Sequence, residues 1–304
     1  MRILVTGITG QVGSATVARL TQARLAEPGS IVAADRAMLD LSRPDEIAGK
    51  LDALRPDVII NPAAYTAVDR AEDERDLAFR VNAAGPEVLA QWAAGHRVPL
   101  FHLSTDYVFD GSGVTPWRET DVTGPLGVYG ASKLAGEHAV QAAGGAHLIV
   151  RTSWVYAASG TNFLRTIARV ARERPELRVV DDQIGSPTSA AFIAEALARI
   201  LAAHGGNLGA AFAAAGHCIH LAAGGETSWC GFATAIVEGL KRRGVAVATR
   251  EVVPIPTKDY PTKAVRPLNS RLNLSRLREV YGIVPPSWDA LLEAELDRLV
   301  ESDA

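Results

Sequence analysis

Cysteine is scarce in this chain. Cys218 and Cys230 are the only two among 304 residues, and they do not show the paired spacing of a zinc site. Nor do they form the repeated pattern of a disulfide framework. We therefore expect both thiols to be reduced and structural.

An excess of either charge is also lacking. The 31 basic and 34 acidic residues leave a net charge of −3. Without a basic surplus, nothing points to nucleic-acid binding, and without a block of like charges, nothing points to a disordered tail. Any phosphate must therefore be bound by local groups and not by the overall field of the protein.

Long apolar runs are absent as well. None approaches the about 20 residues that cross a bilayer. The first residues, 1–5, are typical of a strand and not of a signal peptide. We expect a cytoplasmic protein without membrane contact, long enough for one large α/β domain or for a Rossmann domain with a smaller partner.

What the sequence does have, at its start, is a strand, a glycine-rich turn and a helix. The apolar run 3–6 leads into residues 7–13, and a helical pattern of apolar residues follows. In this context the first glycine suits a tight turn, the second lets the backbone approach a pyrophosphate, and the third permits close helix packing. The unpaired N–H groups of the helix would meet the phosphates. The expected cofactor contacts are Gly7, Gly10, Gln11, Val12 and Gly13.

The second strand, 31–34, ends where a dinucleotide-binding chain meets the adenosine ribose. Asp35 would accept from a 2′-hydroxyl and favour NADH, whereas Arg36 could meet a 2′-phosphate and favour NADPH. Both can equally be exposed charges at a strand end, so we expect NADPH or NADH. Asp40 and Leu41 lie where they could reach the adenine, although Asp40 may equally be a turn or cap residue.

The third strand, 58–61, runs into Pro62 and then into small residues that let the chain lie against a dinucleotide. A long helix is predicted from about residue 71 to 94, and its Asn82 is included among the cofactor contacts. The contacts expected from this segment are Ala63, Ala64, Tyr65 and Asn82.

The fourth strand, 100–104, carries polar residues at its carboxyl end. In an open parallel sheet, ligands bind outside that end. Thr105, Asp106 and Tyr107 are therefore site candidates, whereas His102, inside the apolar run, is expected to be a core residue.

Alternating strands and helices predict an α/β fold, with a Rossmann-type doubly wound parallel sheet and a smaller, interleaved C-terminal substrate lobe. A fifth strand covers 147–151. We assign residues 1–153, with parts of about 177–222, to the NAD(P)-binding domain. About 154–176 and 223–304 form the lobe, and 205–216 is expected to be a loose surface connection.

Tyr129 and Lys133 are four residues apart, so on a helix they share one face. The ammonium would lower the phenol pKa from about 10 towards neutrality, which suits a general acid. Such pairs also occur on ordinary surface helices. Here, however, the helix begins beyond Thr105, beside the expected cofactor. We predict that Tyr129 and Thr105 bond one substrate oxygen, while Lys133 bonds the nicotinamide ribose.

The glycine pattern and Tyr-x-x-x-Lys resemble the extended short-chain dehydrogenase/reductase superfamily. Longer segments resemble the dTDP-4-dehydrorhamnose reductase family, and they run in the expected order from the first strand to the last helices. They are Ala64-Tyr65-Thr66-Ala67-Val68-Asp69, Ser104-Thr105-Asp106-Tyr107-Val108-Phe109-Asp110-Gly111, Val128-Tyr129-Gly130, Arg151-Thr152-Ser153-Trp154-Val155-Tyr156, Asp181-Asp182-Gln183 with Gly185-Ser186-Pro187-Thr188, and Asn269-Ser270-Arg271-Leu272.

This resemblance implies NAD(P)H-dependent reduction of the 4-keto group of dTDP-6-deoxy-L-lyxo-4-hexulose to dTDP-L-rhamnose. Tyr129 would protonate the forming alkoxide, Thr105 would polarise the carbonyl, and Lys133 would tune Tyr129 and bind ribose. The partner would be a nucleotide sugar. The oligomeric state stays open, with a homodimer among the arrangements considered.

By position, the resemblance places a set of residues around the sugar, and Trp154 would offer an apolar face to a deoxy-sugar unless it is a core aromatic. Three further residues are candidates for the diphosphate or nucleotide. Arg266 is favoured by the fit of guanidinium to phosphate, but it is as readily a surface ion-pair partner. The expected substrate contacts are Thr66, Val68, Thr105, Asp106, Tyr107, Trp154, Asn162, Gln183 and Arg266.

Pro62 departs from the family, in which alanine is expected, and it removes a backbone donor. Some members of the family are described as binding a divalent metal between subunits through acidic residues. Carboxylates are scarce in the corresponding segments 14–16 and 189–191, so we predict no metal.

Two other functions are considered. An epimerase or 4,6-dehydratase of the same superfamily is the nearest, but dehydratases have Asp-Glu after the threonine, whereas Thr105 is followed by Asp106 and Tyr107. A catalytically silent regulatory subunit is the other. It would be expected to lack Thr105, Tyr129 or Lys133, and all three are present.

Overall fold

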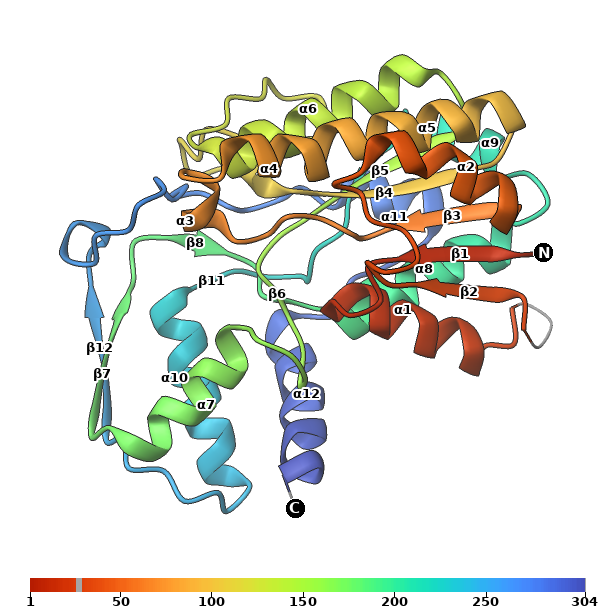
Figure 1. The fold of residues 1–304 in the computed structure, drawn as a ribbon. Helices are drawn as coiled ribbons and strands as arrows, with labels where there is room; N and C mark the ends of the chain where they lie inside the picture. The colour runs from red at the N-terminus through yellow and green to blue at the C-terminus, as the bar shows by residue number, and fades with distance from the viewer. Residues whose placement is uncertain (26–28, 304) are drawn as a thin grey trace.

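Six parallel strands form the central sheet (Figure 1). The structure is a computed structural model that describes residues 1–25 and 29–303. The strands are β1 (Ile3–Thr6), β2 (Ile31–Ala34), β3 (Val58–Asn61), β4 (Leu100–Thr105), β5 (His147–Thr152) and β10 (Cys218–His220). They lie in the order β2-β1-β3-β4-β5-β10, so the strand order reverses between β1 and β3. Such a switch point is where α/β sheets bind ligands. The predicted doubly wound sheet is confirmed.

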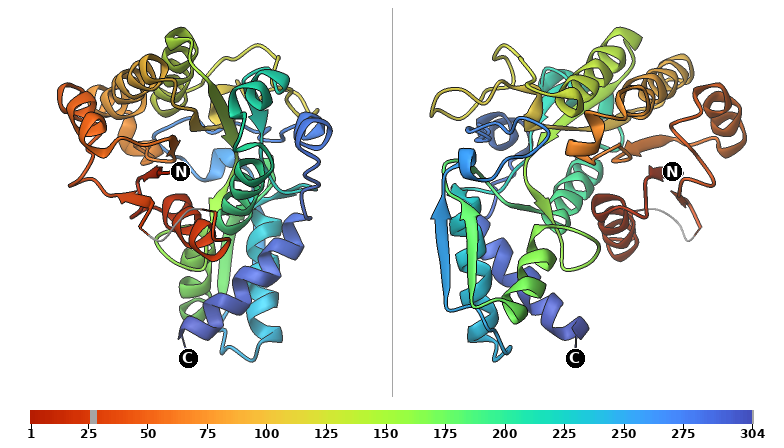
Figure 2. Two further views of the ribbon diagram at one scale, coloured as in Figure 1. Left: turned by 90° about the vertical axis from the view of Figure 1, so that its right-hand side faces the viewer. Right: turned by 60° about the vertical axis from the view of Figure 1, so that its left-hand side comes forward.

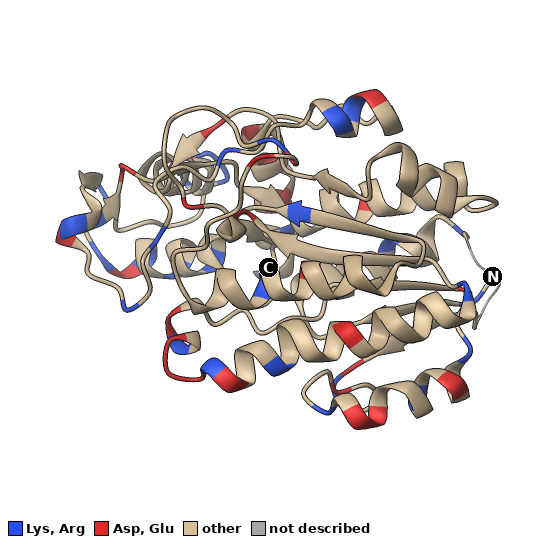
Figure 3. Cartoon of the chain, turned by 90° about the horizontal axis from the view of Figure 1, so that it is seen from above, with Lys and Arg blue, Asp and Glu red and all other residues tan. Residues whose placement is uncertain are grey.

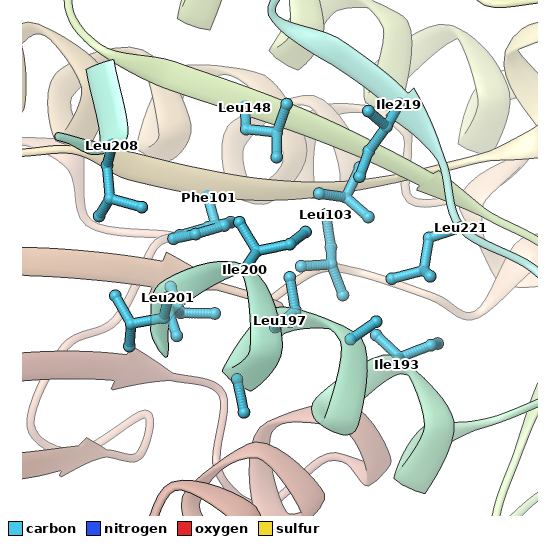
Figure 4. Packing of buried hydrophobic residues seen from close by; sticks show 14 of the residues in the cluster. Phe101, Leu103, Leu148, Ile193, Leu197, Ile200, Leu201, Leu208, Ile219 and Leu221 are labelled. Atoms are coloured by element: carbon cyan, nitrogen blue, oxygen red, sulfur yellow. The ribbon is translucent and has the colours of Figure 1, made fainter. Parts of the chain in front are cut away.

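Helices cover both faces of this sheet, as Figure 1 shows. One face carries α2 (Pro44–Leu54), α5 (Gly85–His96) and α6 (Val128–Ala143), and the other carries α1 (Gln11–Gln22), α8 (Ala190–His204), α9 (Leu208–Ala214) and α11 (Ser275–Tyr281). Because side chains alternate along a strand, Leu4 packs towards α2 and α5 while Ile3 packs towards α8. Figure 4 shows Phe101 and Leu103 of β4 facing the apolar side of α8. The buried sheet thus holds the strand ends in a rigid row.

The single helix predicted for residues 71–94 is wrong. The chain instead forms α3 (Val68–Ala71), α4 (Arg75–Phe79), a π-helical turn η1 (Arg80–Ala84) and then α5. Pro86 has no N–H to donate to the carbonyl of Asn82 four residues earlier, which disfavours an ordinary α-helical turn there. That carbonyl faces Gly136 of α6, where an added Cβ would lie 2.0 Å from it. The irregular turn therefore lets α6 approach closely.

The segment 205–216 is not the loose connection that its composition predicts. It contains α9, whose N-cap Asn207 accepts a hydrogen bond from the backbone N–H of Ala210 at 3.2 Å. Leu208 and Phe212 are buried, and Phe212 packs edge-on against Phe101 at 4.9 Å. Two apolar residues four positions apart were enough to fix this short helix on the sheet.

A smaller lobe extends beyond the sheet and carries the C-terminus (Figure 2). Its helices α7 (Phe163–Glu173), α10 (Trp229–Arg242) and α12 (Trp288–Asp303) share one apolar cluster. Strands β7 (Glu176–Val180) and β12 (Glu251–Ile255) pair in parallel at its side. Residues 177–222 were predicted to belong only in part to the NAD(P)-binding domain. Within that range β7 packs with the lobe, whereas α8, α9 and β10 pack with the sheet. The exact domain boundary stays a prediction.

Short strand pairs connect the lobe to the sheet domain. They are β6 (Val155–Tyr156) with β9 (Thr188–Ser189), and β8 (Ile184–Gly185) with β11 (Thr227–Ser228). In Figure 3, Lys and Arg alternate with Asp and Glu along the helices, and neither sign gathers on one side of this view. Over the described ranges 1–25 and 29–303, no helix is long and apolar enough to cross a membrane.

Candidate active site

The glycine turn between β1 and α1 lies at the switch point of the sheet. Gly7 has a φ of +60°, which favours glycine, and an added Cβ would lie 2.8 Å from the Cα of Ala63. At Gly13 an added Cβ would lie 2.3 Å from the carbonyl oxygen of Gly7, so α1 packs directly on the turn. Gly10 is the N-cap of α1 and offers no side-chain acceptor to its first N–H groups. These donors suit a phosphate, so the turn fits a dinucleotide.

At the end of β2, the candidate ribose contacts are held in a local turn. Asp35 accepts a hydrogen bond from the backbone N–H of Met38 at 2.9 Å. The exposed Arg36 donates from Nε to Asp40 at 3.1 Å, and Asp40 also accepts from both the backbone and the hydroxyl of Ser42. Asp40 therefore stabilises the turn, as one of its two interpretations predicts, and it holds Arg36 at the end of β2.

After β3, Asn82 links the chain to the helix of the tyrosine–lysine pair. Its Oδ1 accepts from the backbone N–H of Tyr65 at 2.7 Å, and its Nδ2 donates to the Tyr65 carbonyl at 3.0 Å and to Ser132 Oγ at 2.9 Å. Asn82 is fully buried, so both ends of its amide serve protein groups. We interpret it as a residue that positions the 63–65 segment, and its expected contact with the cofactor stays a prediction.

Thr105 and Tyr129 meet at the carboxyl end of β4. Thr105 caps the 3₁₀ turn η2 (Asp106–Val108): its Oγ1 accepts from the N–H of Tyr107 at 3.2 Å and donates to Asp106 Oδ1 at 3.1 Å. The Thr105 hydroxyl also lies close enough to the phenol of Tyr129, in the first turn of α6, to act on its pKa. Gly130 allows this approach, because a Cβ there would lie 2.2 Å from the Tyr107 carbonyl.

The electrostatics of Tyr129 differ from the prediction. Burial raises the pKa of the phenol well above 10; the nearby Thr105 hydroxyl opposes this effect, whereas Asp106 and Tyr107 add to it. The expected lowering by Lys133 is wrong for this structure, because Lys133 Nζ turns to the backbone and donates to the Leu103 carbonyl at 2.6 Å. Tyr129 therefore holds its proton at neutral pH, which is the form that a proton donor needs.

Lys133 itself is only 2% exposed. Burial lowers the pKa of its ammonium to about 8, and the nearby carboxylate of Glu137 opposes that effect. The helix thus presents a protonated phenol and, one turn later, an ammonium that titrates close to working pH.

Two of the candidate sugar residues, Asp106 and Tyr107, lie beside Tyr129. Asp106 is 3% exposed, and among residues 1–25 and 29–303 its Oδ2 makes no hydrogen bond of ordinary geometry. Burial raises its pKa to about 6, and the nearby hydroxyls of Ser270 and Thr105 oppose that effect. The Tyr107 ring packs edge-on against Tyr129 with centroids 5.5 Å apart. Thr66 is exposed and Val68 half-buried where α3 begins. A ligand oxygen beside Tyr129 would find several polar groups within a small volume.

Arg266 reaches the same place from the C-terminal part of the chain. Its Nη1 donates to the Tyr107 hydroxyl at 3.2 Å, and its Nη2 forms an ion pair of 2.5 Å with Asp69. It is thus both an ion-pair partner and a neighbour of the predicted sugar pocket.

Trp154 lies in an aromatic stack between the sheet and the lobe. It has a φ of +49°, is 9% exposed, and stacks on Trp229 at 3.7 Å. Gln183 accepts from Trp229 Nε1 at 3.1 Å and donates to Thr257 at 3.0 Å. The stack makes Trp154 largely a packed aromatic, because only 9% of its surface is exposed.

Asn162 lies against the glycine turn. Its Nδ2 donates to Gln11 Oε1 at 2.9 Å and to the Ala157 carbonyl at 2.8 Å, while its Oδ1 caps α7 by accepting from Arg165 N. The structure therefore places Asn162 beside the glycine turn.

Comparisons with known proteins agree on one family. Residues 1–301 match the family model for the RmlD substrate binding domain. The chain is 48% identical over 292 residues to a dTDP-4-dehydrorhamnose reductase of Burkholderia thailandensis, covering 95% of each chain. This chain belongs to the dTDP-4-dehydrorhamnose reductase family. A solved reductase of the family from Clostridium acetobutylicum has a TM-score of 0.86 at 33% identity, with 99% of this chain and 100% of that one covered. The Bacillus anthracis reductase, solved in complex with NADP, has a TM-score of 0.84 at 33% identity, with 98% and 99% covered.

Some residues at this reductase-family site were not singled out from the sequence. Trp229 was recognised only as the start of a helix, and Asp69 only as part of a motif. No local pattern reveals either contact, because both partners come from distant segments. Among the described residues, no group of three or more His, Cys, Asp or Glu could hold a metal. The prediction of no metal stays a prediction.

Proposed function

We propose that this protein reduces the 4-keto group of dTDP-4-dehydro-L-rhamnose to give dTDP-L-rhamnose, with NADPH or NADH as cofactor. The observation that carries the proposal is that Thr105, at the end of β4, and a protonated, half-buried Tyr129, at the start of α6, lie at the same edge of the sheet as the glycine turn after β1. Membership of a reductase family supports it.

The glycine turn supports the cofactor. Its close packing, and the uncapped N–H groups of α1, form a cradle that side chains would fill at Gly7 and Gly13. The NADP in the Bacillus anthracis relative supports NADPH for this chain too. When bound, the nicotinamide supplies a hydride for C4 of the sugar.

In this mechanism the protein supplies the proton and the orientation. Thr105, whose hydroxyl donates to Asp106 Oδ1 in the free protein, would turn its proton to the keto oxygen, which also accepts from Tyr129. The two hydrogen bonds polarise the carbonyl for hydride addition at carbon. Tyr129 then donates its proton to the oxygen, so that one hydride and one proton complete the alcohol. Lys133, one helical turn away, is proposed to bond the nicotinamide ribose.

For the sugar nucleotide, we propose Thr66, Val68, Asp106, Tyr107 and an edge of Trp154 around the hexose. Asp106 Oδ2 can accept from a sugar hydroxyl, because among the described residues it makes no hydrogen bond of ordinary geometry, although the Ser270 hydroxyl lies near the carboxyl. Arg266 is proposed to bind the diphosphate, which would compete with Asp69 for its guanidinium. The roles of Gln183 and Asn162 are proposed to be indirect, through Trp229 and Gln11.

The deciding experiment incubates the purified protein with dTDP-4-dehydro-L-rhamnose and NADPH, and follows both cofactor oxidation and the product. Stoichiometric oxidation with dTDP-L-rhamnose formed is expected. Turnover of the sugar without net oxidation would instead indicate an epimerase. A homodimer and a cytoplasmic location also remain proposals, and light scattering tests the first.

A further inference from the structure

A buried carboxylate lies one helical turn after Lys133. Glu137 is 1% exposed. Arg151 of β5 donates two hydrogen bonds to it, from Nη2 to Oε2 at 2.6 Å and from Nε to Oε1 at 2.9 Å. The two-point contact matches an ionised carboxylate. The mechanism above uses neither residue.

Glu137 and Lys133 both hold the strand that ends in Thr105. Lys133 Nζ donates to the Leu103 carbonyl at 2.6 Å, and Ser104 Oγ donates to Glu137 Oε1 at 2.5 Å. Leu103 and Ser104 directly precede Thr105 in β4. Two consecutive residues of β4 are thus fixed to α6, the helix that carries Tyr129.

Glu137 is also the acidic group that acts on Lys133. Burial disfavours the ammonium, and the Glu137 carboxylate is the one charge that opposes this effect. Other titratable groups on the elements packed against α6 include His102 on β4, Asp106 and Tyr107 on η2, Tyr129 on α6 itself, and His147 and Arg151 on β5. His102 is uncharged, because burial holds its pKa well below the usual value.

We propose that Glu137, held by Arg151, is a positioning residue of this reductase: it fixes the end of β4 against α6 through Ser104, and it keeps the buried Lys133 charged. The inference rests on the proposed function, which supplies the reaction. It adds a residue that touches neither substrate nor cofactor, and acts through Lys133 and Thr105.

The test compares Glu137→Gln with two other variants. The glutamine keeps the shape and an acceptor for Ser104 but removes the charge, so the alkaline limb of kcat/KM should move about one pH unit lower. Ser104→Ala removes one contact and keeps the charge, so that limb should stay in place while kcat falls. Glu173→Gln breaks an exposed ion pair with Arg169 and should match the wild type.

Glu137→Gln removes the carboxylate that pairs with Arg151 and leaves a buried, unpaired charge, which can prevent folding. In the double variant Glu137→Gln/Arg151→Gln, the loss of the Arg151 charge offsets part of the effect, so the alkaline limb should move in the same direction but by less than in Glu137→Gln; circular dichroism establishes its fold. A folded variant lacking the carboxylate, but with the alkaline limb and kcat/KM of the wild type, would overturn the proposal. Absence of wild-type turnover would refute the proposed function instead, so the two failures are distinguishable.

Discussion

Lys133 donates a 2.6 Å hydrogen bond to the carbonyl oxygen of Leu103, two residues before Thr105 in β4. The contact turns the ammonium into the sheet and leaves it almost without solvent. Its pKa is consequently lowered to about 8, while burial raises the pKa of Tyr129. In the free protein, Lys133 should therefore lose its proton at a lower pH than Tyr129. A lysine that acidifies its neighbour would give the opposite order, with the tyrosine losing its proton first.

The pH dependence of the reaction follows from that order. Lys133 is charged below about pH 8 and neutral above it, so kcat/KM for NADPH should fall as the pH rises through 8, while Tyr129 stays protonated. The contribution of Lys133 to the free energy of unfolding should not fall over this range. Between about pH 8 and the ordinary lysine pKa of 10.5, the unfolded chain binds more protons at Lys133 than the folded protein does. A rise in pH through this range therefore favours the folded state. Rate profiles and unfolding curves from pH 6 to 10 check both. A profile in Lys133→Met with the same alkaline limb would contradict the assignment.

Tyr129→Phe should remove the proton donor and little else. The ring stays packed against Tyr107, so NADPH affinity should be retained while kcat falls by about 10²- to 10⁴-fold. Stopped-flow reduction and a fluorescence titration with NADPH measure the two quantities. Tyr260→Phe, at an exposed tyrosine, is the matched control. Unchanged turnover in Tyr129→Phe would rule out this residue as the donor.

Cofactor choice should depend on Arg36. Its guanidinium is held by Asp40 beside the ribose position, where a 2′-phosphate would form charge-assisted hydrogen bonds. Arg36→Ala should therefore weaken NADPH binding by about tenfold or more and affect NADH less. Arg43→Ala, which breaks an exposed pair with Glu46 nearby, serves as the control. Equal losses for the two cofactors in Arg36→Ala would count against this role.

Replacement of glycine by alanine should have opposite effects on stability at Gly13, which packs on the glycine turn, and at Gly49, which faces open space. Gly13→Ala places a Cβ 2.3 Å from the Gly7 carbonyl oxygen, so the helix must shift, which should cost about 1–3 kcal/mol of stability and much of the NADPH affinity. Gly49→Ala, in α2, meets nothing within 4 Å and should stabilise the protein by about 0.5–1 kcal/mol. Denaturant unfolding measures both. Equal stability of the two variants would show that the turn tolerates a side chain.

The sequence predicts the parts of this site that depend on short-range pattern. Strand ends and helical spacing were sufficient to bring Thr105, Tyr129 and Lys133 to one edge of the sheet. The direction of the Lys133 ammonium was beyond such reasoning, because it depends on a backbone carbonyl of another element. The same holds for Trp229, which meets Trp154 only through the fold of the lobe. The π-helical turn at Asn82 was missed because Pro86 and the close approach of Gly136 act together across two helices.

Arg266 is the residue whose two interpretations an experiment can separate. Its guanidinium contacts both Asp69 and the Tyr107 hydroxyl, so it is neither free nor remote from the site. If it binds the diphosphate, Arg266→Gln should raise KM for the nucleotide sugar by about tenfold with a smaller change in kcat, since a charge-assisted hydrogen bond is lost away from the reacting carbon. Lys263→Gln removes a neighbouring ion pair, with Asp73, in the same segment and should leave KM unchanged. An unchanged KM in Arg266→Gln, together with reduced stability, would mean that Arg266 only ties its segment to Asp69 on α3.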